Sequence, residues 1–247
     1  MTCLVHPRES LTTDSKLAKI LACLDWKAVV DSGTKDDRPI RIWHSDEAHD
    51  KSGWINHRRF KIDKARVNDV FEQVFHYPIS VDPRAAYYPV VVEKIFGHQT
   101  HGKVVKCPCG PRKDRVYQKL ITNHPKESWL EEWRIDMFGN SCLVTRKQLD
   151  KDAFGFPGPE RRAGAFTFDV PIADAFTDTE ILRLALFARK IGMEYGSLDA
   201  LRDLDGRLYV IDATTQTACP NPLWHGNVTE HMYVKRSAEK FKEAFGR

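Results

Sequence analysis

The stretch EYGSLDALRDLDGRLYVIDATTQTACPNP, residues 194–222, has the pattern of two β-strands around a turn. Asp205-Gly206 favours a two-residue type I′ turn between antiparallel strands. A hairpin closed there predicts five opposed pairs: Leu204 with Arg207, Arg202 with Tyr209, Ala200 with Ile211, Asp199 with Asp212, and Ser197 with Thr214. Two carboxylates therefore meet on one face of the hairpin.

The pair of Asp199 and Asp212 needs a compensating charge. Directly opposed residues have Cβ atoms about 4.5–5.5 Å apart, and like charges placed so are destabilising. A lysine or arginine, a shared proton, or a hard cation such as Mg²⁺ would relieve the repulsion. The alternatives are a salt-bridged hairpin end without a ligand, or a register that differs by one residue.

The composition describes an ordinary globular protein. The 247 residues are 42% hydrophobic and 29% charged, enough for one large or two small domains. The formal net charge of +4 is spread along the chain, which favours anionic ligands such as nucleotide phosphates and argues against a dedicated nucleic-acid arm. We expect no signal peptide, no membrane partner and a cytoplasmic location, with the six cysteines as reduced thiols.

Proline and glycine divide the chain into three blocks of mixed α and β character: 1–83, 84–125 and 126–247. The apolar patterns predict helices at 16–24 and 64–77, and strands at 26–31, 38–45, 87–96, 103–107, 116–121, 133–138 and 141–146. Thr177 and Glu180 form a predicted capping box for a further helix, and Gly192 is placed to end it. The sequence thus indicates an α+β fold whose middle block is a small antiparallel sheet.

A lysine beside a glycine-bounded loop lies in the middle block. Lys94 ends an apolar strand, and the loop from Gly97 to Gly102 follows. An ammonium group pairs with oxyanions, and free loop N–H groups can close over phosphate. The GxxxxGK[ST] pattern is absent, so this is not a Walker A loop, and a plain hairpin loop is the alternative.

Two further patterns concern metal and anion binding. Borderline-soft ligands within a dozen residues make zinc a hypothesis for His98, His101, Cys107 and Cys109, although the C-x-C spacing is tighter than usual. Basic residues lie on or beside two neighbouring strands of the third block, at Arg134, Arg146 and Lys147. A partly buried Arg134 would need an anionic partner, and an ordinary surface salt bridge is the alternative.

In this order, Lys94, the YQKLI strand, Arg134 and the hairpin resemble the ATP-grasp superfamily over roughly residues 85–222. The resemblance implies two α+β lobes of mainly antiparallel sheet with the nucleotide held between them, and ATP and Mg²⁺ as cofactors. It implies that Lys94 contacts phosphate and that the loop from Gly97 to Gly102 is a lid. It further implies an adenine-ribose hinge at Gln118, Lys119, Leu120 and Ile121, and metal ligands at Asp199, Asp212 and Thr214. Catalytic roles would fall to Lys94, Arg134 and Arg146, with Lys147 as the alternative to Arg146 for the basic residue on the next strand.

The sequence departs from the family pattern at the metal-binding end. Where the family has ExN, this chain has Asp212-Ala213-Thr214, and Thr215-Gln216 follows where the branch it resembles has a lysine. Block 1–83 is short for a substrate-binding domain. The main hypothesis is an ATP-dependent ligase that activates the carboxylate of a small-molecule substrate as an acyl-phosphate, for attack by an amine or thiol. The alternative functions are a small-molecule kinase, a catalytically lapsed nucleotide-binding protein and a zinc-stabilised module. A homodimer is a separate hypothesis about the partner of the chain.

Overall fold

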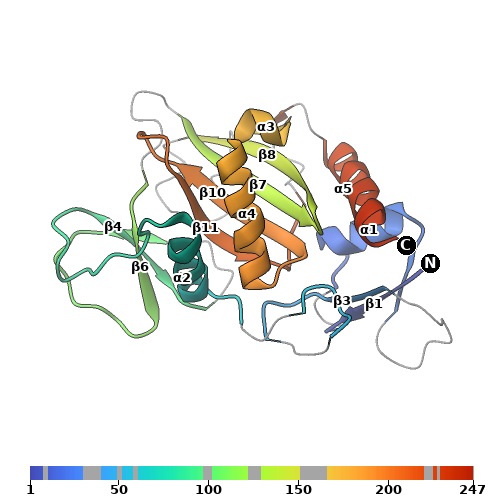
Figure 1. Ribbon diagram of the computed structural model, residues 1–247, viewed down its shortest axis with the longest axis horizontal. Helices are drawn as coiled ribbons and strands as arrows, with labels where there is room; N and C mark the ends of the chain where they lie inside the picture. The colour runs from blue at the N-terminus through green and yellow to red at the C-terminus, as the bar shows by residue number, and fades with distance from the viewer. Residues whose placement is uncertain are drawn as a thin grey trace.

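The structure, a computed structural model, has the predicted α+β character (Figure 1). It describes residues 1–7, 11–29, 40–48, 52–57, 61–96, 102–121, 129–150, 166–219, 225–226 and 229–246. Three sheets organise these residues: one of six strands and two of three strands. No helix in these ranges is both long and apolar enough to cross a membrane.

The six-stranded sheet has the order β11-β10-β7-β8-β9-β12 and is antiparallel except where β12 meets β9. Its strands are β7 (Trp129–Phe138), β8 (Ser141–Asp150), β9 (Phe166–Val170), β10 (Tyr195–Arg202), β11 (Leu208–Thr214) and β12 (His225–Gly226). Residues of β7, β8, β10 and β11 join one large hydrophobic core, and Val170 of β9 packs against it. The opposite face carries the polar side chains described below.

Helices α2 (Lys64–Phe75) and α4 (Asp178–Ile191) pack beside each other on that core (Figure 1). The Asp63 side chain caps the N-terminus of α2, and the predicted capping box of Thr177 and Glu180 begins α4. Gly192 ends α4 with a φ of 73°, as predicted from a residue that adopts the left-handed region without strain. The predicted apolar stripe of α2 is buried: Val67, Val70, Phe71, Val74 and Phe75.

The small sheet has the order β5-β4-β6 and is antiparallel. It consists of β4 (Val90–Lys94), β5 (Lys103–Val105) and β6 (Arg115–Lys119), at one end of the molecule (Figure 1). Three buried residues form the centre of its core: Ala86, Val90 and Tyr117. This sheet corresponds to the predicted middle block.

The N-terminal segment forms a parallel sheet of order β2-β1-β3, at β1 (Thr2–His6), β2 (Lys27–Val29) and β3 (Ile40–Trp43). Strand β1 was not predicted. This sheet shares a second core with α1 (Lys16–Cys23), α5 (Glu230–Phe245) and the adjoining ends of β7 and β10. Figure 1 shows α1 and α5 side by side near both chain ends. The short α3 (Ile172–Ala175) precedes α4.

The β10–β11 hairpin confirms the opposition of Asp199 and Asp212, and of Ser197 and Thr214, but corrects the pairs nearer the turn. Ala200 faces Val210 and Arg202 faces Leu208, because the loop is one residue longer than predicted. Gly206, with a φ of 81°, donates its N–H to the carbonyl of Asp203, as in a three-residue loop. A β-bulge at Ile211 then restores the predicted register.

The bulge has a packing reason. Side chains of a strand alternate between its two faces, so without an extra residue Val210 would share the face of Asp212. With the bulge, Val210 and Ala200 oppose each other and are both fully buried in the large core. The carboxylate can therefore face away from the core while the next part of the strand faces into it.

Candidate functional site

A row of polar residues crosses the six-stranded sheet on the face away from the large core. Asp212 of β11 lies opposite Asp199 of β10, and Asp199 lies opposite Arg134 of β7. Arg134 donates from Nε to Asp199 Oδ1 at 2.9 Å and from Nη2 to Oδ2 at 3.1 Å. The positive charge that Asp199 needs is therefore supplied by a bidentate guanidinium on the neighbouring strand.

Lys147 of β8 adds a second cation to Asp199. Its Nζ lies 3.5 Å from Asp199 Oδ1, and it also forms an ion pair with Glu132 of β7. Burial by itself would raise the pKa of Asp199, but the charges of Arg134 and Lys147 outweigh burial and hold that pKa well below its ordinary value. Asp199 is thus a firmly ionised carboxylate.

Lys64, the first residue of α2, forms an ion pair with Asp212. Its Nζ lies 3.2 Å from Asp212 Oδ2 and 3.0 Å from Glu93 Oε2 of β4, and it donates to the carbonyl of Ile211 at 3.2 Å. Its backbone N–H also donates to the carbonyl of Ile95. Lys64 therefore joins the small sheet to the six-stranded sheet at the acid pair.

Asp212 is the less satisfied of the two acids. Burial raises its pKa, and the charges of Asp199 and Glu93 add to that effect against the opposing charge of Lys64. Its side chain is nevertheless 42% exposed. The connected cluster has four carboxylates, on Asp199, Asp212, Glu93 and Glu132, and three cations, on Arg134, Lys147 and Lys64.

The predicted phosphate lysine lies on a different face. Lys94 is exposed at the end of β4 and is the neighbour of Glu93, so strand alternation directs it away from Lys64 and Asp212. It lies opposite Arg115 of β6. Gly102 does lie at the cluster, because a Cβ placed there would be 2.8 Å from Glu93 Oε1. Gly97 is outside the described residues.

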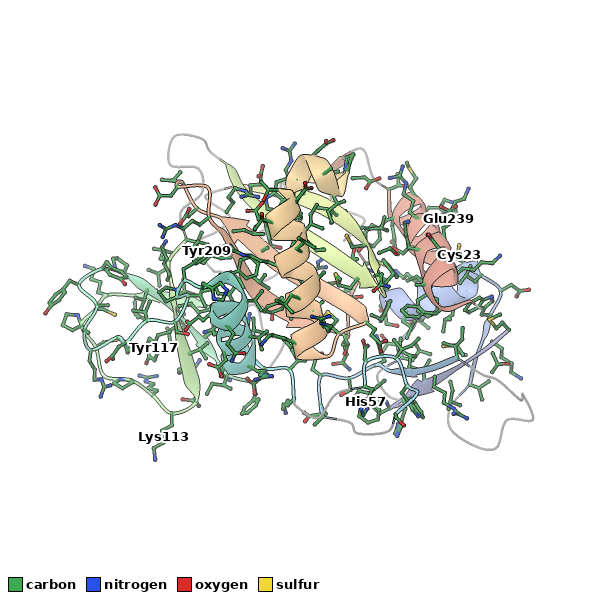
Figure 2. The ribbon with its side chains drawn as sticks, in the orientation of Figure 1. Cys23, His57, Lys113, Tyr117, Tyr209 and Glu239 are labelled. Atoms are coloured by element: carbon green, nitrogen blue, oxygen red, sulfur yellow. The ribbon has the colours of Figure 1, made fainter. Side chains whose placement is uncertain are left out.

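The four predicted hinge residues follow one another along β6 and its end. Gln118 is buried and donates to Asn68 Oδ1 of α2 at 2.7 Å, while Lys119 donates to Asp203 at 3.0 Å and to the Tyr209 hydroxyl at 2.7 Å. Leu120 is exposed and Ile121 is buried in the large core. These residues thus connect the small sheet to α2 and the hairpin, and Figure 2 labels Tyr117 and Tyr209 on the two sides of that connection.

Arg146 and Lys147, adjacent on β8, lie on opposite faces of the sheet. Arg146 faces Trp133, with its guanidinium carbon 6.0 Å from the centre of that ring, and it pairs with Glu131 at 3.5 Å. The structure therefore brings Lys147, and not Arg146, to Arg134 and Asp199. The two-residue turn at Gly139 and Asn140, which pairs Phe138 with Ser141, is a sequence signal that could have shown this register.

Thr214 is engaged by the N-terminal segment. Its hydroxyl donates to Asp46 Oδ2 at 2.9 Å and accepts the N–H of Gln216 at 3.1 Å. Asp46 Oδ1 also accepts the N–H and hydroxyl of Thr215, at 2.8 and 3.0 Å. Neither Asp46 nor Lys64 was singled out from the sequence, because each reaches the hairpin from a distant segment.

A second charged network lies farther along the same face. Lys16 Nζ is 2.6 Å from Asp136 Oδ1, and both side chains are fully buried. Asp136 also accepts hydrogen bonds from the hydroxyls of Ser197 and Tyr233. Because Asp136 and Arg134 are two residues apart on one strand face, this network fixes α1 and α5 beside the candidate site.

The structure describes two of the four residues of the zinc hypothesis. Cys107 and Cys109 lie at the small sheet with their sulfurs 3.9 Å apart, while His98 and His101 are outside the described residues. Among the residues that the structure does describe, no group of three or more metal-ligating side chains gathers at one point.

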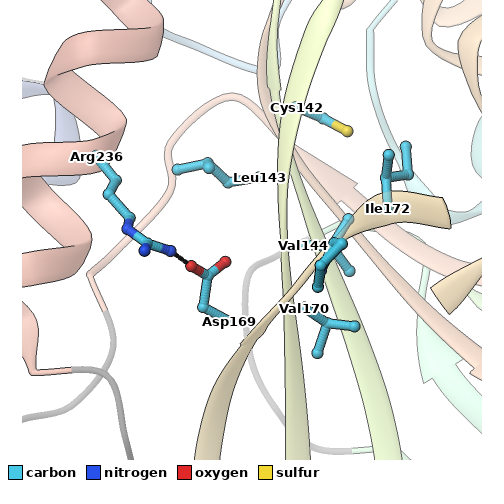
Figure 3. Close-up of a pocket in the computed structure, with 8 residues that line it drawn as sticks. Cys142, Leu143, Val144, Asp169, Val170, Ile172 and Arg236 are labelled. Carbon is cyan, nitrogen blue, oxygen red and sulfur yellow. Dashed lines mark ion pairs between the residues drawn. The ribbon is translucent and has the colours of Figure 1, made fainter. Parts of the chain in front are cut away.

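A cavity of about 450 Å³ lies elsewhere, between β8, β9 and the surrounding helices (Figure 3). Apolar side chains such as Val144, Val170 and Ile172 line it, and the ion pair of Arg236 and Asp169 lies at its side. None of the predicted site residues lines this cavity.

Comparisons with known proteins identify the architecture. No protein-family model matches the sequence, and no curated protein matches it. Among solved structures, the ATP-grasp ligase PsnB complexed with precursor peptide PsnA2 and AMPPNP is 10% identical, with a TM-score of 0.56 over 98% of this chain and 97% of that chain. The macrocyclase MdnC bound with precursor peptide MdnA from Microcystis aeruginosa is 12% identical, with a TM-score of 0.52 over 98% and 100% of the two chains.

A third similar structure is the RimK domain ATP-grasp protein from Sphaerobacter thermophilus, which is 11% identical, with a TM-score of 0.54 over 99% of this chain and 98% of that chain. In the PsnB complex with its minimal precursor, the match covers 74% of this chain and only 60% of that chain. These likenesses concern the fold of the chain as a whole. The chain has the fold of the ATP-grasp ligases.

Proposed function

We propose that this protein is an ATP-dependent ligase-like enzyme that activates a carboxylate as an acyl-phosphate, for attack by an amine or thiol. The observation that carries the proposal is the charged cluster at the junction of the two sheets. Its members come from α2, β4, β7, β8, β10 and β11, and its side chains are of the types that hold phosphate and divalent cations.

The cluster fits a magnesium–nucleotide complex in its chemistry. Among the described residues the cluster joins four carboxylates to three cations, and Asp212 is its partly exposed acid with the raised pKa. We assign Asp212 and Asp199 to the metal, with Thr214 beside them. Bound Mg²⁺ would neutralise the phosphate oxygens and orient the phosphoryl group for transfer.

The cationic side chains have distinct parts in the proposal. Arg134 and Lys147 hold Asp199 ionised and in place, and Lys64 supplies a positive charge for phosphate oxygens at the side of Asp212. Lys94 and the loop from Gly97 to Gly102 remain our proposed phosphate lysine and lid, and residues 118–121 our proposed hinge. Arg146 remains a proposed contributor from the far face of β8.

Two substrate classes are compatible with this chemistry. A small carboxylic acid is one, with an amine or thiol as the second substrate. The other is a carboxylate side chain of a peptide, since MdnC and PsnB are described as complexes with precursor peptides. A small-molecule kinase differs from either ligase in that ADP release would require a hydroxyl or phosphate acceptor and no amine or thiol.

ADP release from Mg²⁺ and ATP tests the proposal, measured with a panel of carboxylates and peptides, each with and without an amine or thiol. We expect acceptor-dependent release in the wild type and its loss in Asp212→Asn. Asp205→Asn, at the exposed tip of the same hairpin, is the matched control and should retain activity. Equal rates in both variants would contradict the assigned role of Asp212.

A second candidate is a nucleotide-binding protein without turnover, and specific contacts favour it. Both oxygens of Asp199 accept from Arg134, and the Thr214 hydroxyl donates to Asp46. Such a protein would show a Mg²⁺-dependent increase in melting temperature with ATP or ADP, and no ADP release with any acceptor. No shift with any nucleotide would argue against both candidates.

A further inference from the structure

Six free cysteines differ sharply in their surroundings, and two of them form a pair. Burial raises the pKa of Cys3 to about 12 and that of Cys142 and Cys219 to about 11, as for inert core thiols. Cys23 is exposed on α1. Cys107 and Cys109 are half-buried and neighbours in space as well as in sequence.

The distance between the two sulfurs matches metal ligation. Cys107 Sγ and Cys109 Sγ are 3.9 Å apart. A tetrahedral ion with metal–sulfur bonds of about 2.3 Å holds two thiolates about 3.8 Å apart. A disulfide would require about 2.05 Å. This separation is that of a hydrogen bond between the two thiols, and it is also the separation that a shared ion requires.

The turn that carries the cysteines is fixed by contacts with the small sheet. The N–H of Cys109 donates to the carbonyl of Pro83 at 2.8 Å. The Tyr117 hydroxyl accepts the N–H of Arg112 at 3.2 Å and donates to the carbonyl of Gly110 at 3.4 Å. Both cysteines also pack against the buried core of the sheet. This anchoring preorganises the two ligands and reduces the entropy lost on binding.

The electrostatic surroundings favour thiolates once an ion is present. Exposed basic residues flank the pair in the chain at Lys106, Arg112 and Lys113, and Figure 2 shows Lys113 extending from this turn into solvent. A bound ion would replace the two thiol protons, because the thiolate is the form that ligates metal.

We propose that Cys107 and Cys109 form a bidentate site for a thiophilic divalent cation such as Zn²⁺. Binding converts two thiols into two thiolates and releases two protons, with no change of oxidation state. Because the described residues offer two ligands here and no third, the remaining coordination positions are open to water or to another ligand. The site is separate from the candidate nucleotide site and does not depend on the proposed function.

Cobalt titration of reduced, metal-free protein tests the proposal, because Co²⁺ bound by thiolates gives a sulfur-to-metal charge-transfer band in the near ultraviolet. We expect the band at one Co²⁺ per chain in the wild type and its loss on addition of excess Zn²⁺. It should be absent from the double variant Cys107→Ser/Cys109→Ser and unchanged in the control Cys23→Ser/Cys142→Ser. An unchanged band in the first variant, or none in the wild type, would overturn the proposal.

A measurement on the wild type alone covers the case in which the double variant does not fold. Alkylation by iodoacetamide, read by peptide mass spectrometry, should be slowed by Zn²⁺ at Cys107 and Cys109 and unaffected at exposed Cys23. If Zn²⁺ leaves the alkylation rates of Cys107 and Cys109 as unchanged as that of Cys23, the site is refuted. Circular dichroism of the metal-free variants establishes whether a lost band reflects lost ligands.

Discussion

The six-stranded sheet and the small sheet are held together in different ways. Buried side chains from β7, β8, β10 and β11 form one core with α2 and α4, whereas three buried residues centre the core of the small sheet. The small sheet is joined to the rest largely by polar contacts: Lys64 with Glu93, Gln118 with Asn68, and Lys119 with Asp203 and Tyr209. Large apolar cores resist opening, while a weakly buried sheet tied by polar contacts opens more easily. The candidate site therefore lies where the stable six-stranded sheet meets the small sheet, which should open more easily.

The largest effect should follow a cavity in the large core. Phe71 is fully buried, stacks on Phe75 at 4.6 Å and lies 5.7 Å from the Tyr209 ring. Phe71→Ala should lower the free energy of unfolding by about 3–5 kcal/mol, measured in urea. Val90→Ala, in the small sheet, should cost less and should mainly speed amide exchange in β4 and β6. A larger loss of unfolding free energy in Val90→Ala than in Phe71→Ala would show that the small sheet contributes more to global stability than the large core does.

Loss of the guanidinium at the junction should come next. Arg134→Met leaves the largely buried Asp199 carboxylate without its bidentate partner, with Lys147 at 3.5 Å and the charge of Lys64 farther away. We expect a loss of about 3 kcal/mol in the free energy of unfolding. Lys235→Met, at an exposed position of α5, is the control for removing one positive charge. Equal losses for the two variants would mean that the bidentate pair contributes nothing particular.

The two opposed aspartates should respond to pH in opposite directions. The folded-state pKa of Asp199 is lowered, so its stabilisation is present above the unfolded pKa and is lost as pH falls through the folded value. The folded-state pKa of Asp212 is raised, so ionisation there costs stability as pH rises through the unfolded value and onward. At neutral pH, Asp199→Asn should destabilise by about 1–3 kcal/mol, while Asp212→Asn should be neutral or slightly stabilising. Urea midpoints from about pH 2 to pH 7 measure both, since the Asp199 contribution is lost below its unfolded pKa, and the same sign for both variants would contradict this prediction.

The smallest effect should come from one polar tie of the small sheet. Lys119→Met removes the contacts with Asp203 and Tyr209. Since Lys119 is partly exposed, we expect a loss of at most about 1 kcal/mol in global stability. Amide exchange of β6 should nevertheless accelerate, while that of β7 should not. Unchanged exchange in β6 would show that Ile121 and Gln118 hold the sheet without this lysine.

Local signals in the sequence explain what could be predicted. The capping box and the C-terminal glycine of α4 and the apolar stripe of α2 depend on neighbouring residues, and the structure confirms them. The opposition of Asp199 and Asp212 was predicted correctly although the loop was not, because the longer loop and the bulge shift the register by one residue each in opposite senses. The short strand β1 has no alternating pattern long enough to distinguish it.

The cations of the site show where local signals end. Lys64 reaches Asp212 from a segment far away in the sequence, a contact set by how α2 packs against β11. No spacing within either segment encodes that approach. The sequence could have shown that Lys147, and not Arg146, shares a face with Arg134, since the turn at Gly139 fixes the register of β7 and β8. Lys94 and Glu93 pose the same one-residue question, but Lys94 was singled out by its place beside the glycine-bounded loop and by the family resemblance, and not by the strand's alternation.

The bulge at Ile211 also limits how the length of the hairpin can vary during evolution. A loop shortened by one residue could keep Asp199 opposite Asp212 only by flattening the bulge, and that change would turn Val210 out of the core. An insertion would require a second bulge or displace the aspartate. The length of the exposed loop at residues 204–206 is therefore constrained by a buried valine, and in related chains that retain both Asp212 and Val210 we expect loop length to vary less than loop sequence.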